Sequence, residues 1–171
     1  MNDRQLALIK EFVALCEAAD IECWLRGGWA MDFFLGYVTR EHEDIDLFAW
    51  AKDAPRLVYE LERAGFREQQ GPPSDAQRDF TKDEEEVQIA LLDRTQRGEI
   101  VIAGGPWKGA PFPEGMLHFP VGRLGDVVCP IVTPRVQIEI KEKFPEWTGR
   151  PPSEKHQADI ARLQQALRLL S

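Results

Sequence analysis

Two aspartates, Asp44 and Asp46, stand two positions apart at the start of a segment whose other residues predict a core strand at 45–50. Because side chains alternate along a strand, both carboxylates point to the same face, with Cβ atoms roughly 7 Å apart. Ile45 and Leu47 point to the opposite face, toward the core. Magnesium prefers oxygen ligands and is commonly held by one or two carboxylates together with substrate phosphates. The pair therefore predicts a magnesium site that faces a phosphate-bearing ligand.

A glycine pair, Gly27 and Gly28, precedes this strand and leads into a predicted short helix. Without Cβ atoms the backbone approaches a ligand closely, and the first amides of the following helix point toward an anion. Each feature alone has an ordinary structural interpretation, since Gly-Gly is most often a turn and Asp-Xaa-Asp is most often structural or solvated. When the glycine pair and the two aspartates lie on adjacent strands, they favour a site in which backbone amides bind phosphate beside two carboxylates that bind a metal ion.

Apolar periodicity and capping residues predict the elements that position this block. In chain order, these are a helix at 4–19, a strand at 21–25, a short helix ending near Gly36, a strand at 45–50, a helix between Asp53 and Gly65, strands at 78–81 and 87–92, a long structured loop at 104–122, a strand at 127–132, a helix from Thr133 to about 144, and a last helix capped by Ser153. The acidic run at 83–86 predicts a solvated turn. Trp107 and Trp147 lie near loops that could border a pocket, where a flat ring would stack on a ligand.

The chain has 171 residues and a formal net charge of −8. We expect one domain over 1–171, with a core at 1–96 and a loop, last strand and C-terminal helices at 97–171. The first part has a net charge of −10, which argues against nucleic acid as a partner because phosphate binding needs a basic patch. No segment approaches the roughly 18 apolar residues of a membrane span, so we expect a cytoplasmic protein without a membrane partner. The three cysteines predict reduced, buried thiols.

The block at 25–47 resembles the signature of the nucleotidyltransferase superfamily that includes DNA polymerase beta. It is most similar to the small-molecule branch, the lincosamide nucleotidyltransferases and aminoglycoside 2″-adenylyltransferases. The matching features are Gly-Gly-Trp-Ala at 27–30, Asp32, Gly36, Arg-Xaa-His at 40–42 and Asp-Ile-Asp at 44–46. A looser resemblance continues through 78–92, 128–144 and Lys-His-Xaa-Xaa-Asp-Ile at 155–160. The resemblance implies an α/β (α+β) fold, with a mixed, mostly antiparallel sheet flanked by helices and a C-terminal helical segment.

The same resemblance implies transfer of a nucleoside monophosphate, AMP from ATP or the equivalent from another triphosphate, to a hydroxyl of a small molecule. Lincosamide and aminoglycoside antibiotics are the leading acceptors, and a homodimer is conceivable. By this analogy the metal ligands are Asp44 and Asp46, and the residues that bind the nucleotide are Gly27, Gly28, Arg40, His42 and Lys141. Asp32 would brace the glycine turn. The alternative for Arg40 and His42 is a surface pair that balances neighbouring glutamates.

One position departs from the family pattern. The third carboxylate of the family sits in a strand of the pattern apolar-Asp-apolar, and Gln88 occupies that position here. An amide cannot act as a general base at neutral pH. Glu86, two residues earlier on the same strand face, could replace it, as could a group of the substrate or one of the acids at 41 and 43. Alternatively, catalysis has been lost and a nucleotide-binding protein remains. Modification of a protein or RNA hydroxyl is a further alternative.

Overall fold

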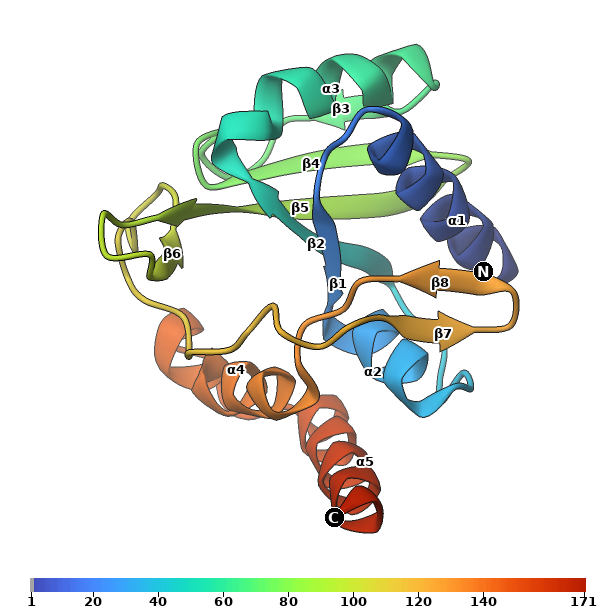
Figure 1. Ribbon diagram of the computed structural model, residues 1–171, viewed down its shortest axis with the longest axis vertical. Coiled ribbons are helices and arrows are strands. Elements are labelled where there is room, and N and C mark those ends of the chain that lie inside the picture. The colour runs from blue at the N-terminus through green and yellow to red at the C-terminus, as the bar shows by residue number, and fades with distance from the viewer. Residues whose placement is uncertain (1) are drawn as a thin grey trace.

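The computed structural model describes residues 2–171 and has a six-stranded mixed sheet at its centre (Figure 1). Five strands follow the order β1-β2-β5-β4-β3, and β6 pairs with the end of β5. Strands β2 and β5 run parallel, and the other pairs in this sheet are antiparallel. The strands are β1 (Cys23–Arg26), β2 (Asp44–Trp50), β3 (Arg67–Gln69), β4 (Gln77–Lys82), β5 (Glu85–Arg94) and β6 (Ile100–Ile102). The predicted mixed, mostly antiparallel sheet is therefore confirmed.

Five α-helices, a short 3₁₀ helix (Ala51–Asp53) and a separate hairpin are the other elements of the described residues. Helices α1 and α3 lie together beside the sheet, α2 continues directly from β1, and α4 and α5 lie at the end of the molecule that holds the C-terminus (Figure 1). The elements are α1 (Asn2–Ala18), α2 (Gly27–Leu35), α3 (Ala54–Arg63), α4 (Pro134–Thr148), α5 (Glu154–Leu170) and the hairpin β7 (Gly122–Leu124) with β8 (Val127–Cys129).

The main sheet separates two apolar clusters, as the alternation of β2 requires. Ile45 and Leu47 belong to a large cluster with α1 and α3. Phe48 and Trp50 belong to a smaller cluster on the other face, which includes Val136 of α4. Asp44 and Asp46 lie on this second face, at the end of β2 where apolar packing gives way to polar side chains. The three cysteines are buried with free thiols, as predicted.

Most predicted elements are present, with differences at their ends. Only Asp83 and Glu84 form the turn between β4 and β5, and both have positive φ, so half of the acidic run belongs to the strand. Helix α4 continues through Pro145 to Thr148 and ends at Gly149 in the left-handed conformation, four residues beyond the prediction. Asp53 makes no side-chain cap for α3, whereas the predicted Ser153 cap of α5 accepts a hydrogen bond from the His156 amide at 3.0 Å.

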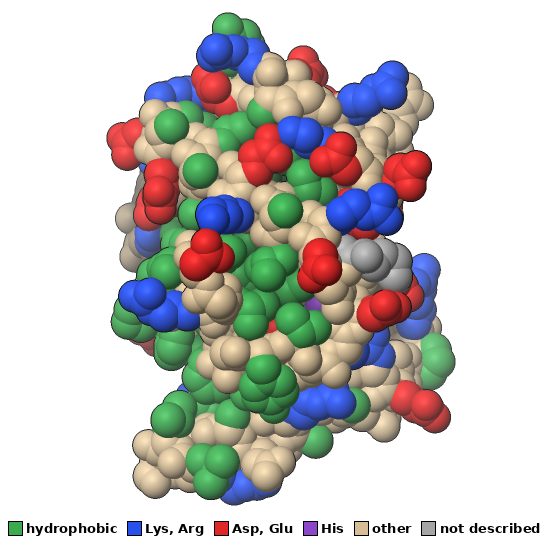
Figure 2. All heavy atoms as spheres, turned by 90° about the vertical axis from the view of Figure 1, so that its right-hand side faces the viewer, with side chains coloured by type: hydrophobic (Ala, Val, Ile, Leu, Met, Phe, Trp, Pro, Cys, Tyr) green, Lys and Arg blue, Asp and Glu red, His purple; other side chains and the backbone are tan. Residues whose placement is uncertain are grey.

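Figure 2 turns the right-hand side of Figure 1 toward the viewer and shows one face of the surface. Basic and acidic side chains are interspersed there among apolar ones, so the basic groups of this face do not form one large patch (Figure 2). Among residues 2–171, no helix combines the length and the apolar character needed to cross a membrane.

Candidate active site

A row of polar side chains crosses one face of the main sheet. The strand register places Arg26 of β1 beside Asp46 of β2, Asp46 beside Gln88 of β5, and Gln88 beside Asp79 of β4. Residues paired in register share a face, so these side chains point the same way. Sequence analysis brought Asp46 and Gln88 together correctly. It did not single out Asp79, although it predicted the two strands that the observed register brings together, because nothing in the local sequence shows which residue of the first strand stands opposite Gln88.

The two aspartates form a site with unbalanced negative charge. Burial, followed by the negative charge of Asp46, raises the pKa of Asp44 to about 6. Arg26 opposes this shift, and its Nη2 lies 3.6 Å from Oδ1 of Asp46. The Gln88 amide donates a hydrogen bond from Nε2 to Oδ2 of Asp44 at 3.3 Å. Two carboxylates that share one nearby arginine are a suitable donor set for a divalent cation.

Glu86 lies in register with Asp44 on the β2·β5 pair, and its charge adds to the rise of the Asp44 pKa. Its side chain is exposed. Within residues 2–171, no three acidic, histidine or cysteine side chains converge closely enough to hold a metal by themselves. Asp44 and Asp46 would therefore hold magnesium with the help of water and phosphate oxygens, and Glu86 stands beside this pair.

The glycine turn packs directly against the acidic pair. Gly27 has φ +69°, which L side chains rarely adopt, and a Cβ on it would lie 3.0 Å from Oδ2 of Asp46. A Cβ on Gly28 would lie 2.5 Å from Nδ1 of His42. Helix α2 begins at Gly27, and Arg26 provides no side-chain cap. The first amides of α2 therefore lie beside the acidic pair, as a phosphate cradle requires.

The buried His42 side chain packs against the glycine turn at Gly28. Its side chain is 3% exposed, with Nε2 at 2.6 Å from Oδ2 of Asp32 and Nδ1 at 3.0 Å from Nη1 of Arg40. Because arginine can only donate, Nδ1 accepts and the Nε2–H donates to Asp32. Both ring nitrogens are thus occupied within the protein. The surface alternative for His42 is wrong, and the proposed bracing role of Asp32 agrees with this contact.

Gln5 of α1 makes hydrogen bonds to Trp29, His42 and Glu85, and so connects α1 to the segments around the glycine turn. The Trp29 indole donates to its Oε1 at 2.8 Å, and its Nε2 donates to the His42 carbonyl at 3.0 Å and to Oε2 of Glu85 at 2.8 Å. The Gln5 side chain is fully buried. Nothing in the sequence distinguishes this residue from an ordinary polar position on an amphipathic helix.

Arg40 and Lys141 meet at a buried carboxylate of α5. Asp159 is fully buried and accepts hydrogen bonds from Arg40 Nη2 at 2.9 Å and Nε at 3.3 Å, and Lys141 Nζ lies 3.4 Å away. Burial alone would raise the pKa of Asp159, but these cations hold it below its usual value. Burial lowers the pKa of Lys141. The only sequence signal for Asp159 was its place in the loosely matching motif at 155–160.

A cavity of about 410 Å³ extends from the acidic pair along the second face of the sheet. Arg26, Gly27 and Asp46 line its inner end, and Lys141 lines its wall on α4. Its remaining lining is mostly apolar and includes five aromatic rings, those of Phe48, Trp107, Phe112, Phe144 and Trp147. Both tryptophans that were predicted to border a pocket therefore line it.

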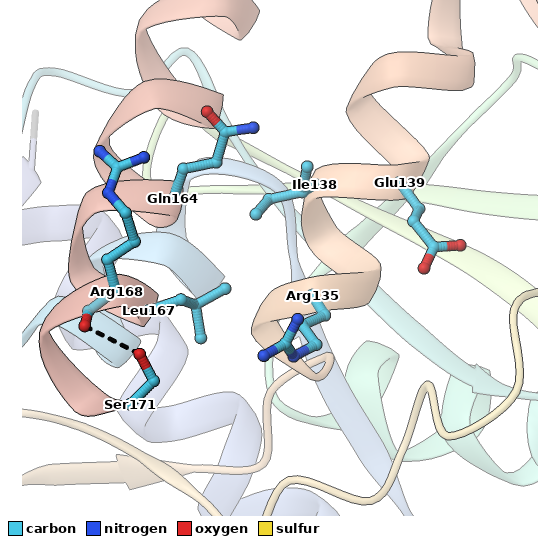
Figure 3. A pocket seen from close by; sticks show the side chains of 7 residues that line it. All are labelled: Arg135, Ile138, Glu139, Gln164, Leu167, Arg168 and Ser171. Atoms are coloured by element: carbon cyan, nitrogen blue, oxygen red, sulfur yellow. Dashed lines mark hydrogen bonds between the residues drawn. The ribbon is translucent and has the colours of Figure 1, made fainter.

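A separate pocket of about 460 Å³ lies between α4 and α5 (Figure 3). Its lining includes Arg135, Leu167 and Arg168, and Figure 3 shows the hydrogen bond from the Ser171 hydroxyl to the Arg168 carbonyl. None of the predicted site residues lines this pocket. The predicted site residues Gly27, Asp46 and Lys141 line the cavity beside Asp46 instead.

The glycine turn at the start of a helix and the acidic pair on the neighbouring strand define a nucleotidyltransferase-type site. Residues 8–163 match the family described as aminoglycoside-2''-adenylyltransferase, and the chain belongs to this family. A 2''-aminoglycoside nucleotidyltransferase of Klebsiella pneumoniae is 45% identical over 47 residues, which is 28% of this chain and 27% of that protein. A lincosamide resistance protein of Staphylococcus haemolyticus is 36% identical over 53 residues, 31% of this chain and 33% of that protein. The aligned segment thus spans only about a quarter to a third of these relatives.

Solved structures share the fold over nearly the whole chain. The antibiotic-resistance factor ANT(2'')-Ia superposes with a TM-score of 0.79 at 21% identity, covering 98% of this chain and 86% of that one. The lincosamide antibiotic adenylyltransferase LnuA, solved with lincomycin bound, has a TM-score of 0.73 at 22% identity, with 94% and 95% coverage. These similarities establish the nucleotidyltransferase fold for this chain.

Proposed function

We propose that this protein transfers AMP from ATP, in the presence of magnesium, to a hydroxyl of a small antibiotic of the lincosamide or aminoglycoside class. The observation that carries the proposal is the contact between the glycine turn and the acidic pair. A single methyl group on Gly27 would meet a carboxylate oxygen of Asp46. Amides that attract phosphate and carboxylates that attract a metal therefore share one small volume, as a metal-bound triphosphate requires.

The reaction forms one bond and breaks another at the α-phosphorus. An oxygen of the acceptor attacks this atom, the bond to the oxygen bridging the α- and β-phosphorus atoms breaks, and pyrophosphate leaves. Gly27 and Gly28 hold triphosphate oxygens through backbone amides, and Arg40 and Lys141 provide positive charge at the α4 side. When bound by Asp44 and Asp46, magnesium supplies charge neutralisation of the triphosphate.

The acceptor hydroxyl must also lose its proton, and Glu86 is our candidate base. Glu86 is exposed and lies in register with Asp44, and its negative charge contributes to the raised pKa of Asp44. Gln88 cannot take the proton, because an amide has no basic site at neutral pH. Replacing Glu86 with glutamine is expected to slow transfer by about 10²–10⁴-fold, the usual contribution of a general base.

A second candidate function is nucleotide binding without transfer, and Gln88 is the observation that favours it. Its amide donates to Asp44, so the position carries a hydrogen-bond donor where the family pattern has a carboxylate. A protein of this kind would bind a nonhydrolysable ATP analogue with magnesium and release no pyrophosphate with any acceptor.

Release of pyrophosphate from ATP and magnesium, measured across a panel of lincosamides and aminoglycosides, separates the two. We expect acceptor-dependent release that Asp46→Ala abolishes and Asp126→Ala preserves. Asp126 is an exposed aspartate whose carboxylate pairs with Lys10, so it controls for the loss of a charge alone. Full activity of Asp46→Ala would contradict the mechanism. A silent wild type together with an active Gln88→Asp variant would favour binding without transfer.

A further inference from the structure

Asp79 of β4 lies on the same face of the sheet as Asp44 and Asp46, and the proposed reaction gives it no role. The strand register places Asp79 directly beside Gln88, which in turn lies beside Asp46. Because neighbouring strands are about 5 Å apart, the Cα atoms of Asp79 and Asp46 are separated by roughly 10 Å. Asp79 therefore lies beyond β5, on the side of the acidic pair where Glu86 would meet the acceptor.

The neighbours of Asp79 on this face are uncharged. Gln69 of β3 stands beside it on the side away from Gln88, and Gln77 precedes it on the same face of β4. Within residues 2–171, no lysine, arginine or histidine forms an ion pair with its carboxylate, and Arg78 points to the opposite face. A carboxylate without a cationic partner is a strong acceptor for an N–H or O–H group of a ligand.

One oxygen of Asp79 is held by the protein and the other is open. Oδ1 accepts a hydrogen bond from Nε2 of Gln77 at 2.8 Å. Oδ2 makes no hydrogen bond to the described residues, and it is not among their buried unpaired atoms, so it keeps contact with solvent. A Cβ on Gly71 would lie 2.9 Å from this oxygen. The φ of Gly71 lies outside the left-handed region, so what its missing side chain provides is space above Oδ2.

The open oxygen faces a groove of about 510 Å³ that adjoins the cavity beside Asp46. Pro72 and Gln77 line both spaces, so a molecule that projects from the cavity along these residues reaches Asp79. The other carboxylate in the groove lining is that of Glu68, and an arginine pairs with it at 2.6 Å. Asp79 is thus the carboxylate of the described groove lining that is available to a ligand.

We infer, on the basis of the proposed function, that Asp79 is a specificity-determining residue for the acceptor. Its Oδ2 accepts a hydrogen bond from an O–H or N–H group of the acceptor while another hydroxyl of the same molecule lies at the acidic pair. Asp79 therefore binds and orients the acceptor, and Glu86 remains the candidate base. A molecule with one hydroxyl and no second donor at this separation lacks the contact and is a poor acceptor.

Two variants remove this contact in different ways. Asp79→Asn keeps the shape of the side chain and an oxygen for the Gln77 amide, but replaces the open oxygen with an N–H donor. Gly71→Ala keeps the carboxylate and its charge, but the added methyl group displaces Oδ2. Asp93→Asn is the matched control, because Asp93 is an exposed aspartate of β5 that shares the opposite face of the sheet with Leu91.

Binding tests the inference independently of turnover. Lincomycin and tobramycin are titrated calorimetrically into the 171-residue protein with magnesium and a nonhydrolysable ATP analogue present, and the compound that the wild type binds more tightly is the probe. We expect the Kd of the probe to rise about 10–100-fold in Asp79→Asn and in Gly71→Ala, the usual effect of a hydrogen bond to a charged group. The double variant should bind no more weakly than Asp79→Asn, because both changes remove the same contact. Asp93→Asn should leave the Kd unchanged.

Several results would overturn the inference. One is an Asp79→Asn variant that binds the probe as tightly as the wild type does, and another is failure of both compounds to bind the wild type. Weaker binding in Asp79→Asn without weaker binding in Gly71→Ala also overturns it, because the carboxylate would then act only through its long-range charge. The affinity for the ATP analogue alone should not change, and an equal loss of that affinity would show a general disturbance of the site instead of a lost contact.

Pyrophosphate release distinguishes failure of this inference from failure of the proposed function. If both variants weaken binding as expected and the wild type releases no pyrophosphate with the probe and ATP, the Asp79 contact stands and the transfer reaction fails. If the wild type releases pyrophosphate and Asp79→Asn has an unchanged KM for the probe, the transfer reaction stands and the role of Asp79 is overturned.

Discussion

Asp44 carries a charge that its surroundings in the folded protein disfavour. It is partly buried next to Asp46, and these two causes raise its pKa to about 6. A carboxyl whose pKa is raised on folding stabilises the protein fully below its unfolded pKa, near 3.9, and this contribution is lost as pH rises through the folded pKa. Without metal, the folded protein therefore becomes less stable as pH rises from about 4 to 6.

Asp44→Asn removes this dependence because the amide cannot ionise. At pH 8 in the presence of a chelator, we expect the variant to be more stable than the wild type by about 1–2 kcal/mol, after allowance for solvent screening. At pH 4.5 the difference largely disappears. Urea denaturation at the two pH values measures it. A variant that is equally or less stable at pH 8 would show that Asp44 is not destabilised by its surroundings.

In the proposed function, a proton and a magnesium ion compete for Asp44, which would link this pKa to activity. Magnesium needs the ionised carboxylate, so half-saturation of activity is expected to require more magnesium below pH 6, by up to about tenfold for each further pH unit. Activity titrated with magnesium at pH 5 and pH 7.5 tests this dependence. A magnesium requirement that does not change with pH would contradict it.

At the scale of elements, α5 holds two cations that we propose lie on the nucleotide side of the site. Its Asp159 holds Arg40, from the segment after α2, and Lys141 of α4. These three residues come from distant parts of the sequence, so α5 fixes the direction in which both cations point. Removal of one partner from a buried charge cluster leaves the others uncompensated.

Asp159→Asn is expected to destabilise the protein by about 3 kcal/mol, because buried Lys141 and half-buried Arg40 lose their shared carboxylate. The KM for ATP should rise several-fold more than kcat falls, since Asp159 positions the cations without contacting substrate. Asp159→Glu should recover part of the lost stability and bring the KM for ATP part of the way back to that of the wild type. Glu154→Gln, on the exposed first turn of the same helix, is the control. An unchanged KM for ATP would limit Asp159 to a purely structural role.

Sequence patterns predicted the elements with strong periodicity and missed those defined only by pairing. Helix α1 and strand β2 have clear apolar repeats, so both were found. Strands β3, β6 and β7 have three residues each, too few for alternation to be visible. For the same reason the acidic pair and the glycine turn could be predicted, whereas Asp79, Asp159 and Gln5 could not. Gln5 and Asp159 contact partners that are distant in the sequence, and Asp79 joins the polar row only through the pairing of β4 with β5.

At the scale of the whole molecule, ligand binding should increase the free energy of unfolding. A ligand that binds only the folded protein stabilises it by about 2.7 kcal/mol at a concentration of 100 times its Kd. For a chain of this size that corresponds to an increase in Tm of about 5–10 °C. Three expectations about the whole molecule stay predictions. They are the division of the domain at residue 96, the homodimer and the cytoplasmic location.

ATP with magnesium is therefore expected to raise Tm, whereas ATP with a chelator should have a much smaller effect. Without the metal, the negatively charged triphosphate would meet two carboxylates at the glycine turn. Differential scanning fluorimetry of the wild type and Asp46→Ala measures both effects, and Asp126→Ala serves as the control variant. Equal shifts with and without magnesium would show that the acidic pair does not take part in nucleotide binding.

The parallel pairing of β2 with β5 has a consequence for protein synthesis. On the ribosome, β2 emerges well before β5, so the nascent chain has an open strand edge until residues 85–94 have been made. The sequence that follows Asp46 on β2 is entirely apolar, which is typical of segments that aggregate. Charged residues on such an edge oppose pairing with another copy. We therefore expect Asp44 and Asp46 to reduce aggregation of the unfinished chain, which a comparison of the solubility of truncated chains ending before β5, with and without Asp44→Ala and Asp46→Ala, would measure.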